Sequence, residues 1–141
     1  MKRLMIMLLL VLTNISYAGM LLNKAVIHHT ASHDVSAKEI DRWHKERGWT
    51  EIGYHFVIRK DGSIEKGRDI NKIGAHAKNP SPSRNNRVGI ALTGYDEFTE
   101  EQYKALGKLL NKLGIQYAEG HHQDCPGKGF DWNKVVSYMA M

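Results

Sequence analysis

The segment Ala25-Val26-Ile27-His28-His29 decides how the rest of the chain is interpreted. A short apolar run that contains two β-branched residues is typical of a strand, and two histidines close it. Successive side chains on a strand point to opposite faces of the sheet, so only one of His28 and His29 can face a given site. The segment therefore predicts a strand that carries one imidazole to a functional site at its end.

The segments that follow alternate between helical and β-rich patterns. Residues 36–39 read Ser-Ala-Lys-Glu, the pattern of a capping box, and predict a helix through Arg47. Residues 53–59 are β-rich. The Asp-Gly signal at 60–62 predicts a hairpin turn into a second strand from Ser63.

The second half of the chain continues this alternation. Residues 74–86 are rich in Asn, Pro, Ser and Gly, and they predict a long surface loop of the kind that carries function. Residues 88–93 predict a buried strand. A second capping box at 99–102 is followed by apolar residues at helical spacing, and Gly114 is expected to end that helix.

The last elements complete an α/β pattern. Residues 115–120 predict one more strand, and Asp131 can cap a final helix through Tyr138. Residues 19–141 are enough for one domain with its own core and too few for two. We therefore expect an α/β fold of a single domain, in which helices flank a central mixed β-sheet.

The first 18 residues have the pattern of a secretory signal. Lys2 and Arg3 precede an apolar run from Leu4 to Leu12, and small residues end the segment at Ala18. The run is shorter than the ~20 residues that cross a bilayer. We therefore expect cleavage after Ala18, export to the periplasm or the medium, and no stable membrane span afterwards; an uncleaved anchor or a buried helix is the alternative.

The net charge says little about the class of function, whereas the single cysteine is more informative. The formal net charge of +5 falls to +3 without the first 18 residues, which contain no acid. That charge suits an anionic envelope as well as nucleic acid, and the chain has no basic-aromatic motif that would favour nucleic acid. Cys125 is the single cysteine, so it is reactive, paired to another chain or a metal ligand.

Candidate metal ligands lie at the ends of two predicted strands. His28 closes the first strand, and His121, His122 and Cys125 follow the last. Two histidines and one cysteine would give zinc three protein ligands and leave a fourth position for water, as in a catalytic site. Histidines that bind no metal are the alternative, and spacing alone does not choose the member of either histidine pair.

Short motifs recur in order from about Ala25 to Trp132, nearly the whole chain after the signal. They are Ile27-His28-His29-Thr30-Ala31, Gly53-Tyr54-His55-Phe56, Asp61-Gly62, Gly67-Arg68-Asp69, Gly74-Ala75-His76-Ala77, Asn86-Arg87-Val88-Gly89-Ile90, and Gly120-His121 with Cys125-Pro126-Gly127. As a set they resemble the type 2 N-acetylmuramoyl-L-alanine amidases. That family includes amidase-type phage lysozymes and the peptidoglycan recognition proteins of animals.

The resemblance implies the α/β fold of the amidases and peptidoglycan recognition proteins, a cofactor and a reaction. It implies a zinc ion held by His28, His121 and Cys125, with Tyr54 as a catalytic residue that hydrogen-bonds the attacking water or the developing oxyanion. The reaction implied is hydrolysis of the amide bond between N-acetylmuramic acid and L-alanine in peptidoglycan. From the residues alone, Tyr54 reads as a half-buried strand aromatic.

The chain departs from the family's phage members near the cysteine. Those members have a longer segment between the zinc histidine and cysteine and a lysine just before the cysteine, whereas Gln123 stands at the lysine's position here. Lys128 is our candidate for the second catalytic group, and a solvated loop lysine is the alternative. Asp124 is a candidate to orient a zinc ligand.

The remaining motif residues are candidates for substrate contact. His76 and Asn86 flank the long loop and could hydrogen-bond the stem peptide or glycan, with hydrogen bonds inside the loop as the alternative. Arg68 could pair with a peptide carboxylate or stabilise the turn with Asp69. We expect peptidoglycan to be the partner and the protein to be a monomer. A peptidoglycan-binding protein without catalysis is the alternative function, against which the presence of Cys125 argues.

Overall fold

A computed structural model describes residues 19–78 and 82–141. The expected signal at 1–18 lies outside these residues. The elements along the chain are β1 (Leu21–His29), α2 (Ala37–Glu46), β2 (Phe56–Ile58), β3 (Ile64–Lys66), the 3₁₀ helix η1 (Pro82–Asn86), β4 (Arg87–Leu92), α3 (Glu100–Leu113), β5 (Tyr117–Gly120) and α4 (Trp132–Met139). None of the helices in the described part of the chain is both long and apolar enough to cross a membrane.

The strands form one sheet in the order β3-β2-β4-β1-β5. β1 runs parallel to both β4 and β5, and β2 runs parallel to β4. The β2–β3 hairpin is antiparallel. The sheet is therefore mixed, as predicted, and β1 lies in its interior, flanked by β4 and β5.

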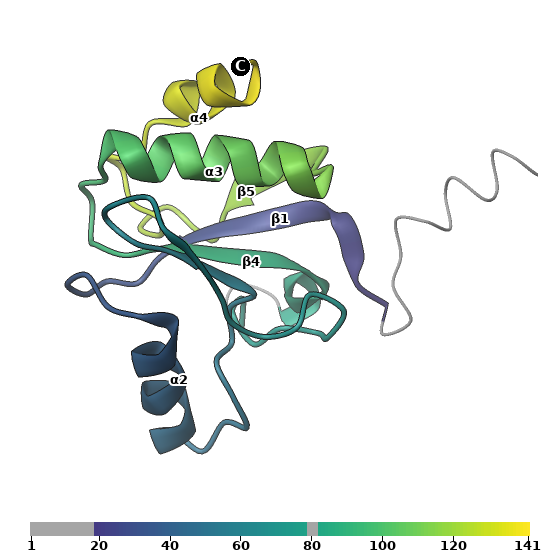
Figure 1. Ribbon diagram of the computed structural model, residues 1–141. Helices are drawn as coiled ribbons and strands as arrows, with labels where there is room; N and C mark the ends of the chain where they lie inside the picture. The colour runs from purple at the N-terminus through teal and green to yellow at the C-terminus, as the bar shows by residue number, and fades with distance from the viewer. Residues whose placement is uncertain (1–18, 79–81) are drawn as a thin grey trace, which may run out of the picture.

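One face of the sheet is covered by α3 and α4 (Figure 1). Alternate residues of β1 and β4 point to this face and pack against the leucines of α3. Such alternation is the pattern of a strand with one face on the core. The fully buried members from strands and helix are Ala25, Ile27, Ile58, Val88, Ile90, Leu92 and Leu106.

The other face, where α2 lies in Figure 1, has a different composition. A small apolar cluster that includes Ile40 and Val57 joins α2 to it. Beyond that cluster the face carries His28, and glycine and alanine stand next to it on β4, where His28 pairs in register with Ala91. Small residues on β4 leave room for imidazole rings above the sheet.

The two capping boxes differ in completeness. At α3, the Thr99 side chain accepts from the Gln102 backbone N–H, and the Gln102 side chain accepts from the Thr99 backbone N–H. At α2, Ser36 accepts from the Glu39 backbone N–H, but the Glu39 carboxylate bonds Arg42. The prediction of a capping box is thus confirmed at α3 and correct only for its first half at α2.

Strand lengths differ most from the pattern in two places, while β5 is two residues shorter than the predicted 115–120. β1 begins at Leu21 because its first residues pair with neighbouring strands through an irregular register, although Asn23 and Lys24 make the sequence there look polar. The β-rich run 53–59 contributes only Phe56–Ile58 to β2. The residues before Phe56 make other backbone hydrogen bonds, including one of 2.9 Å in which the His55 N–H donates to the Gly89 carbonyl of β4.

Candidate metal centre

Three predicted ligands converge at one end of the sheet. His28 is at the end of β1, His121 directly follows β5, and Cys125 lies in the next turn. One ligand atom from each of the three lies within 4.8 Å of the others. Parallel pairing of β1 with β5, with Ile27 opposite Gly120, places the two histidines side by side. The structure therefore brings together the first histidine of each pair and the cysteine.

The short connection between His121 and Cys125 is a tight turn. The His122 and Cys125 backbones exchange two hydrogen bonds of 3.0 Å. This turn directs the Cys125 thiol back to His28, with Sγ 3.7 Å from Nδ1. The following loop packs on Asp96 so closely that a Cβ at Gly127 would meet the Asp96 carboxylate. The shortened segment thus still delivers the cysteine to the cluster.

The donor set fits a zinc ion. Zinc–nitrogen bonds of about 2.05 Å and zinc–sulfur bonds of about 2.3 Å at a tetrahedral angle place the two ligand atoms about 3.6 Å apart. The observed separation of 3.7 Å between the His28 and Cys125 atoms is close to that value. Two imidazoles and one thiol also leave a fourth tetrahedral position for water or substrate.

A second histidine, His76, contacts the ring nitrogen of His28 that does not face Cys125. The His28 side chain is only 2% exposed, and its Nε2 lies 3.0 Å from Nδ1 of His76. The His76 Nε2 in turn lies 2.9 Å from the carbonyl oxygen of Arg87. Burial lowers the pKa of His28 well below its usual value and that of His76 to about 3, so both rings are neutral.

Tyr54 lies beside the cluster. Its ring centroid is 5.1 Å from that of His28 and 5.7 Å from that of His44, which accepts a 2.9 Å hydrogen bond from the Gly53 N–H. Burial raises the pKa of Tyr54, and the nearby Cys125 adds to the effect. The phenol therefore keeps its proton and can act as a hydrogen-bond donor.

Burial also acts on the thiol. It raises the pKa of Cys125 to about 11, so the cysteine is a neutral thiol in the metal-free protein. Metal binding must remove that proton because the thiolate is the ligand. The cluster is thus built from neutral groups, which is a smaller desolvation burden than buried charges would be.

Two residues that sequence reasoning missed support the cluster from the loop side. The Arg84 guanidinium bonds the Gly120 and His121 carbonyls and pairs with Glu119 at 3.0 Å, which ties η1 to the end of β5. The Asn85 side chain accepts hydrogen bonds from the His76 and Ala77 N–H groups at 2.8 and 2.7 Å. The only signal for either residue was its place in the loop expected to carry function.

The three predicted substrate-contact residues, His76, Arg68 and Asn86, differ in burial and in hydrogen-bond partners. His76 is 7% exposed and both its ring nitrogens have protein partners. Arg68 donates to the Ile52 and Ile73 carbonyls, so its guanidinium group already binds the backbone of this chain. Asn86 ends η1 and is partly exposed. These contacts favour supporting roles for His76 and Arg68, and substrate contact by any of the three stays a prediction.

The residues proposed around the cysteine are on the surface. Lys128 is exposed on the loop after Cys125. Asp124 is exposed as well, and its backbone N–H donates to His122 Nδ1 at 3.2 Å. Whether either residue acts on a substrate or a metal ligand stays a prediction.

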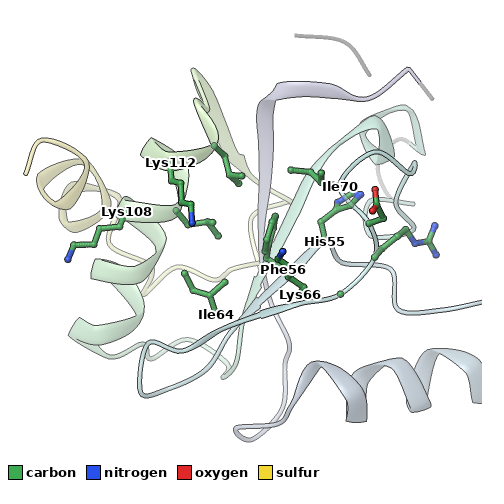
Figure 2. A pocket seen from close by; sticks show the side chains of 12 residues that line it. His55, Phe56, Ile64, Lys66, Ile70, Lys108 and Lys112 are labelled. Carbon is green, nitrogen blue, oxygen red and sulfur yellow. The ribbon is translucent and has the colours of Figure 1, made fainter. Parts of the chain in front are cut away.

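A cavity of about 670 Å³ lies elsewhere, between β3 and α3 (Figure 2). Its lining combines apolar side chains such as Phe56 and Ile64 with Lys66, Lys108 and Lys112. None of the three clustered ligands contributes to it. The candidate metal centre is therefore separate from that cavity.

Comparisons with known proteins identify the family. Residues 19–128 match the N-acetylmuramoyl-L-alanine amidase family. An endolysin of Klebsiella phage KP32 is 40% identical over 108 residues, which cover 68% of this chain and 70% of the endolysin. Peptidoglycan-recognition protein SC1a of Drosophila melanogaster is 31% identical over 140 residues, 83% of this chain and 74% of that protein. The chain belongs to the N-acetylmuramoyl-L-alanine amidase family.

Solved structures agree on the fold. The N-acetylmuramoyl-L-alanine amidase LysC from Clostridium intestinale URNW superposes with a TM-score of 0.72 at 36% identity, and the match covers 84% of this chain and 85% of LysC. The predicted single α/β domain with a mixed sheet of the amidase and peptidoglycan-recognition type is confirmed.

Proposed function

We propose that this chain is a zinc-dependent N-acetylmuramoyl-L-alanine amidase that hydrolyses the amide bond between N-acetylmuramic acid and L-alanine in peptidoglycan. The observation that carries the proposal is the approach of the His28, His121 and Cys125 ligand atoms to within 4.8 Å of one another. Membership of the amidase family supports the bond that is cut. The set of two nitrogens and one sulfur supports zinc over magnesium or calcium, which prefer oxygen ligands.

Each side chain of the site has a task in this reaction. Bound zinc would lower the pKa of water from 15.7 to about 7 and polarise the scissile carbonyl. His28, His121 and Cys125 would hold the ion. The protonated Tyr54 phenol, beside His28, donates a hydrogen bond to the oxyanion that develops on the scissile carbonyl.

The leaving L-alanine nitrogen also needs a proton, and Lys128 is our candidate donor. It is exposed three residues after Cys125, on a loop that packs against Asp96. Asn86 is our candidate for a hydrogen bond to the stem peptide or glycan. If Lys128 has this role, Lys128→Ala lowers turnover and keeps zinc; a near-normal rate assigns the proton donor to another group.

The decisive experiment is digestion of purified sacculi with and without a chelator, followed by mass analysis of the fragments. We expect chelator-sensitive release of stem peptides that begin with L-alanine and of glycan chains with intact glycosidic bonds. New reducing sugar ends in place of new L-alanine amino termini would show a glycosidase. Elemental analysis should find one zinc per chain in the active protein.

A peptidoglycan-binding protein without catalysis is the second candidate, because the chain also resembles a peptidoglycan-recognition protein. That candidate predicts that the protein sediments with sacculi and releases no fragments, whatever the zinc content. The Cys125→Ala variant separates the two functions: the proposed amidase loses zinc and activity, whereas a binder keeps its full function.

We also propose that the protein is exported to the wall it cuts. The charged, apolar and small-residue segments of residues 1–18 support this location. Expression of the full chain followed by mass measurement should give a product that begins at Gly19. A product that keeps Met1 and stays in the cytoplasm contradicts export.

A further inference from the structure

The clearest unexplained feature of the site is the buried histidine behind His28. His76 comes from the loop after Arg68 and lies over β4, where its ring occupies the space that a side chain at position 89 would need. A Cβ at Gly89 would be 2.6 Å from the His76 Cγ and 2.7 Å from its Nε2. The Asn85 side chain fixes the His76 backbone through the N–H groups of residues 76 and 77. His76 is therefore held in a defined position by both its ring and its backbone.

The hydrogen bonds of His76 determine which of its nitrogens carries the proton. A carbonyl oxygen can only accept, so the 2.9 Å contact with Arg87 O requires a proton on His76 Nε2. A neutral imidazole has one N–H, so the His76 Nδ1 carries a lone pair. That nitrogen then accepts from His28 across 3.0 Å.

The same reasoning extends to His28. Its Nε2 must donate to the His76 Nδ1, and its Nδ1 is then the nitrogen with the lone pair. Nδ1 is also the atom that faces the Cys125 Sγ at 3.7 Å. The Arg87 carbonyl therefore determines where the proton lies on both rings, and it leaves the lone pair of His28 Nδ1 directed at the cluster.

We propose that His76 is a positioning residue that links His28 to the Arg87 carbonyl through two hydrogen bonds. This link, called the relay below, fixes the tautomer and ring orientation in which His28 presents Nδ1 to the metal. The proposal rests on the proposed zinc function. A metal-bound histidine usually donates its other N–H to a carboxylate, a backbone carbonyl or water. Here a neutral imidazole stands between the ligand and the carbonyl, which keeps a negative charge out of the buried site.

The relay can be tested in the metal-free full chain, without reference to activity. Nitrogen-15 NMR of the imidazole groups should show His28 with its proton on Nε2 and an unprotonated Nδ1. In the His76→Leu variant the tautomers of His28 should become mixed, because the acceptor is gone. A wild-type His28 protonated on Nδ1 overturns the relay. This measurement uses the wild-type protein, so it does not depend on whether a variant folds.

Zinc affinity gives the second readout. Loss of a partner behind a metal ligand costs ~10–100-fold in affinity, so we expect that loss in His76→Leu. In His76→Asn the side-chain oxygen can replace Nδ1 as acceptor, and affinity should recover to within a few-fold of wild type. His44→Leu is the matched control, since His44 is also buried and bonds a backbone group, the Gly53 N–H; its zinc affinity should stay near the wild-type value.

The outcomes separate the relay from the function on which it rests. If wild type binds no zinc but His28 has the expected tautomer, the zinc function fails and the hydrogen-bond relay stands. If wild type binds zinc and His76→Leu binds it equally well with an unchanged His28 tautomer, the relay fails and the zinc function stands. Equal losses in His76→Leu and His44→Leu would assign His76 a merely structural role.

Discussion

The two faces of the sheet are built from different chemistry. On the face under α3, fully buried aliphatic residues of β1 and β4 pack against leucines, and any side chain of similar shape and volume would serve. On the opposite face, His28 stands next to small residues of β4, and each ring nitrogen has a particular neighbour. The first face stabilises the strand, while the second uses the strand's rigidity to hold a site. Substitutions on the two faces should therefore fail in different ways.

The largest effect should come from His28 and its neighbour on the strand. His28→Ala removes a ligand from the cluster and should lower zinc affinity by more than ~100-fold, beyond the cost of losing a supporting partner. His29→Ala, whose ring contacts the Tyr95 carbonyl, should retain most of the affinity. Titration with a competing chelator measures both values. The reverse order of the two variants would mean that His29 is the ligand, and His121→Ala against His122→Ala repeats the test at β5.

On the core face the expected effect is on stability. Leu106 is fully buried in the main cluster, so Leu106→Ala should lower the free energy of unfolding by about 2–5 kcal/mol. Urea unfolding of the metal-free protein measures it, with Lys104→Ala on the exposed side of α3 as control. The folded fraction of Leu106→Ala should still bind zinc normally. Weakened zinc binding in that fraction would show that the two faces are coupled.

Tyr54→Phe should separate catalysis from construction of the site. The change removes only a hydroxyl, so zinc content and unfolding free energy should stay near wild type. Turnover should fall by ~10²-fold if the phenol stabilises the oxyanion. Kinetics on a soluble muramoyl-peptide substrate, with zinc content measured in the same samples, tests this expectation. Unchanged turnover would restore the interpretation of Tyr54 as a packing aromatic.

The smallest effect should be at Asp34, in the loop that follows β1. Partial burial opposes its ionisation, but hydrogen bonds from Arg59, Thr93 and the Lys60 N–H outweigh it and lower its pKa from 3.8 to about 2. A lowered pKa in the folded state adds stability above pH 3.8, and this contribution is lost as the pH falls towards 2. Because the carboxylate is 39% exposed, we expect less than ~1 kcal/mol. The stability difference between wild type and Asp34→Asn should fade across that window; a constant difference contradicts the assignment.

The core face could be predicted from the sequence because its information is periodic. Leucines at helical spacing in 100–113 and apolar runs in 25–27 and 88–92 define elements without knowledge of their partners, and these elements are all present. The brevity of β2 was not predictable in this way. The residues before it belong to the same β-rich run, but their backbone also bonds loop segments: the Ala75 N–H donates to the Gly53 carbonyl, and the Arg68 N–H donates to the Tyr54 carbonyl.

The site face could be predicted only in part, because its information lies in contacts between distant segments. Motif resemblance supplied His28, His121 and Cys125, which the structure brings together. The pattern could not indicate that both ring nitrogens of His76 bond groups of the protein, because that depends on the glycine at position 89 and on the direction of the Arg87 carbonyl. Arg84 and Asn85 were missed because their contacts are mostly with backbone groups, which no residue pattern records.

The pairing of β1 with β5 also orders events in time. Cys125 is 97 positions beyond His28, and the strand that brings the segments together is the last of the sheet along the chain. A chain emerging from the ribosome presents His28 early and cannot close the cluster until Tyr117–Gly120 has been made and has docked on β1. Contacts between segments so far apart form late and slowly, because the intervening chain must be ordered first. Metal uptake should therefore report that the chain has been made through Cys125 and that β5 has docked on β1, and a chain halted before residue 117 should bind no zinc at this site.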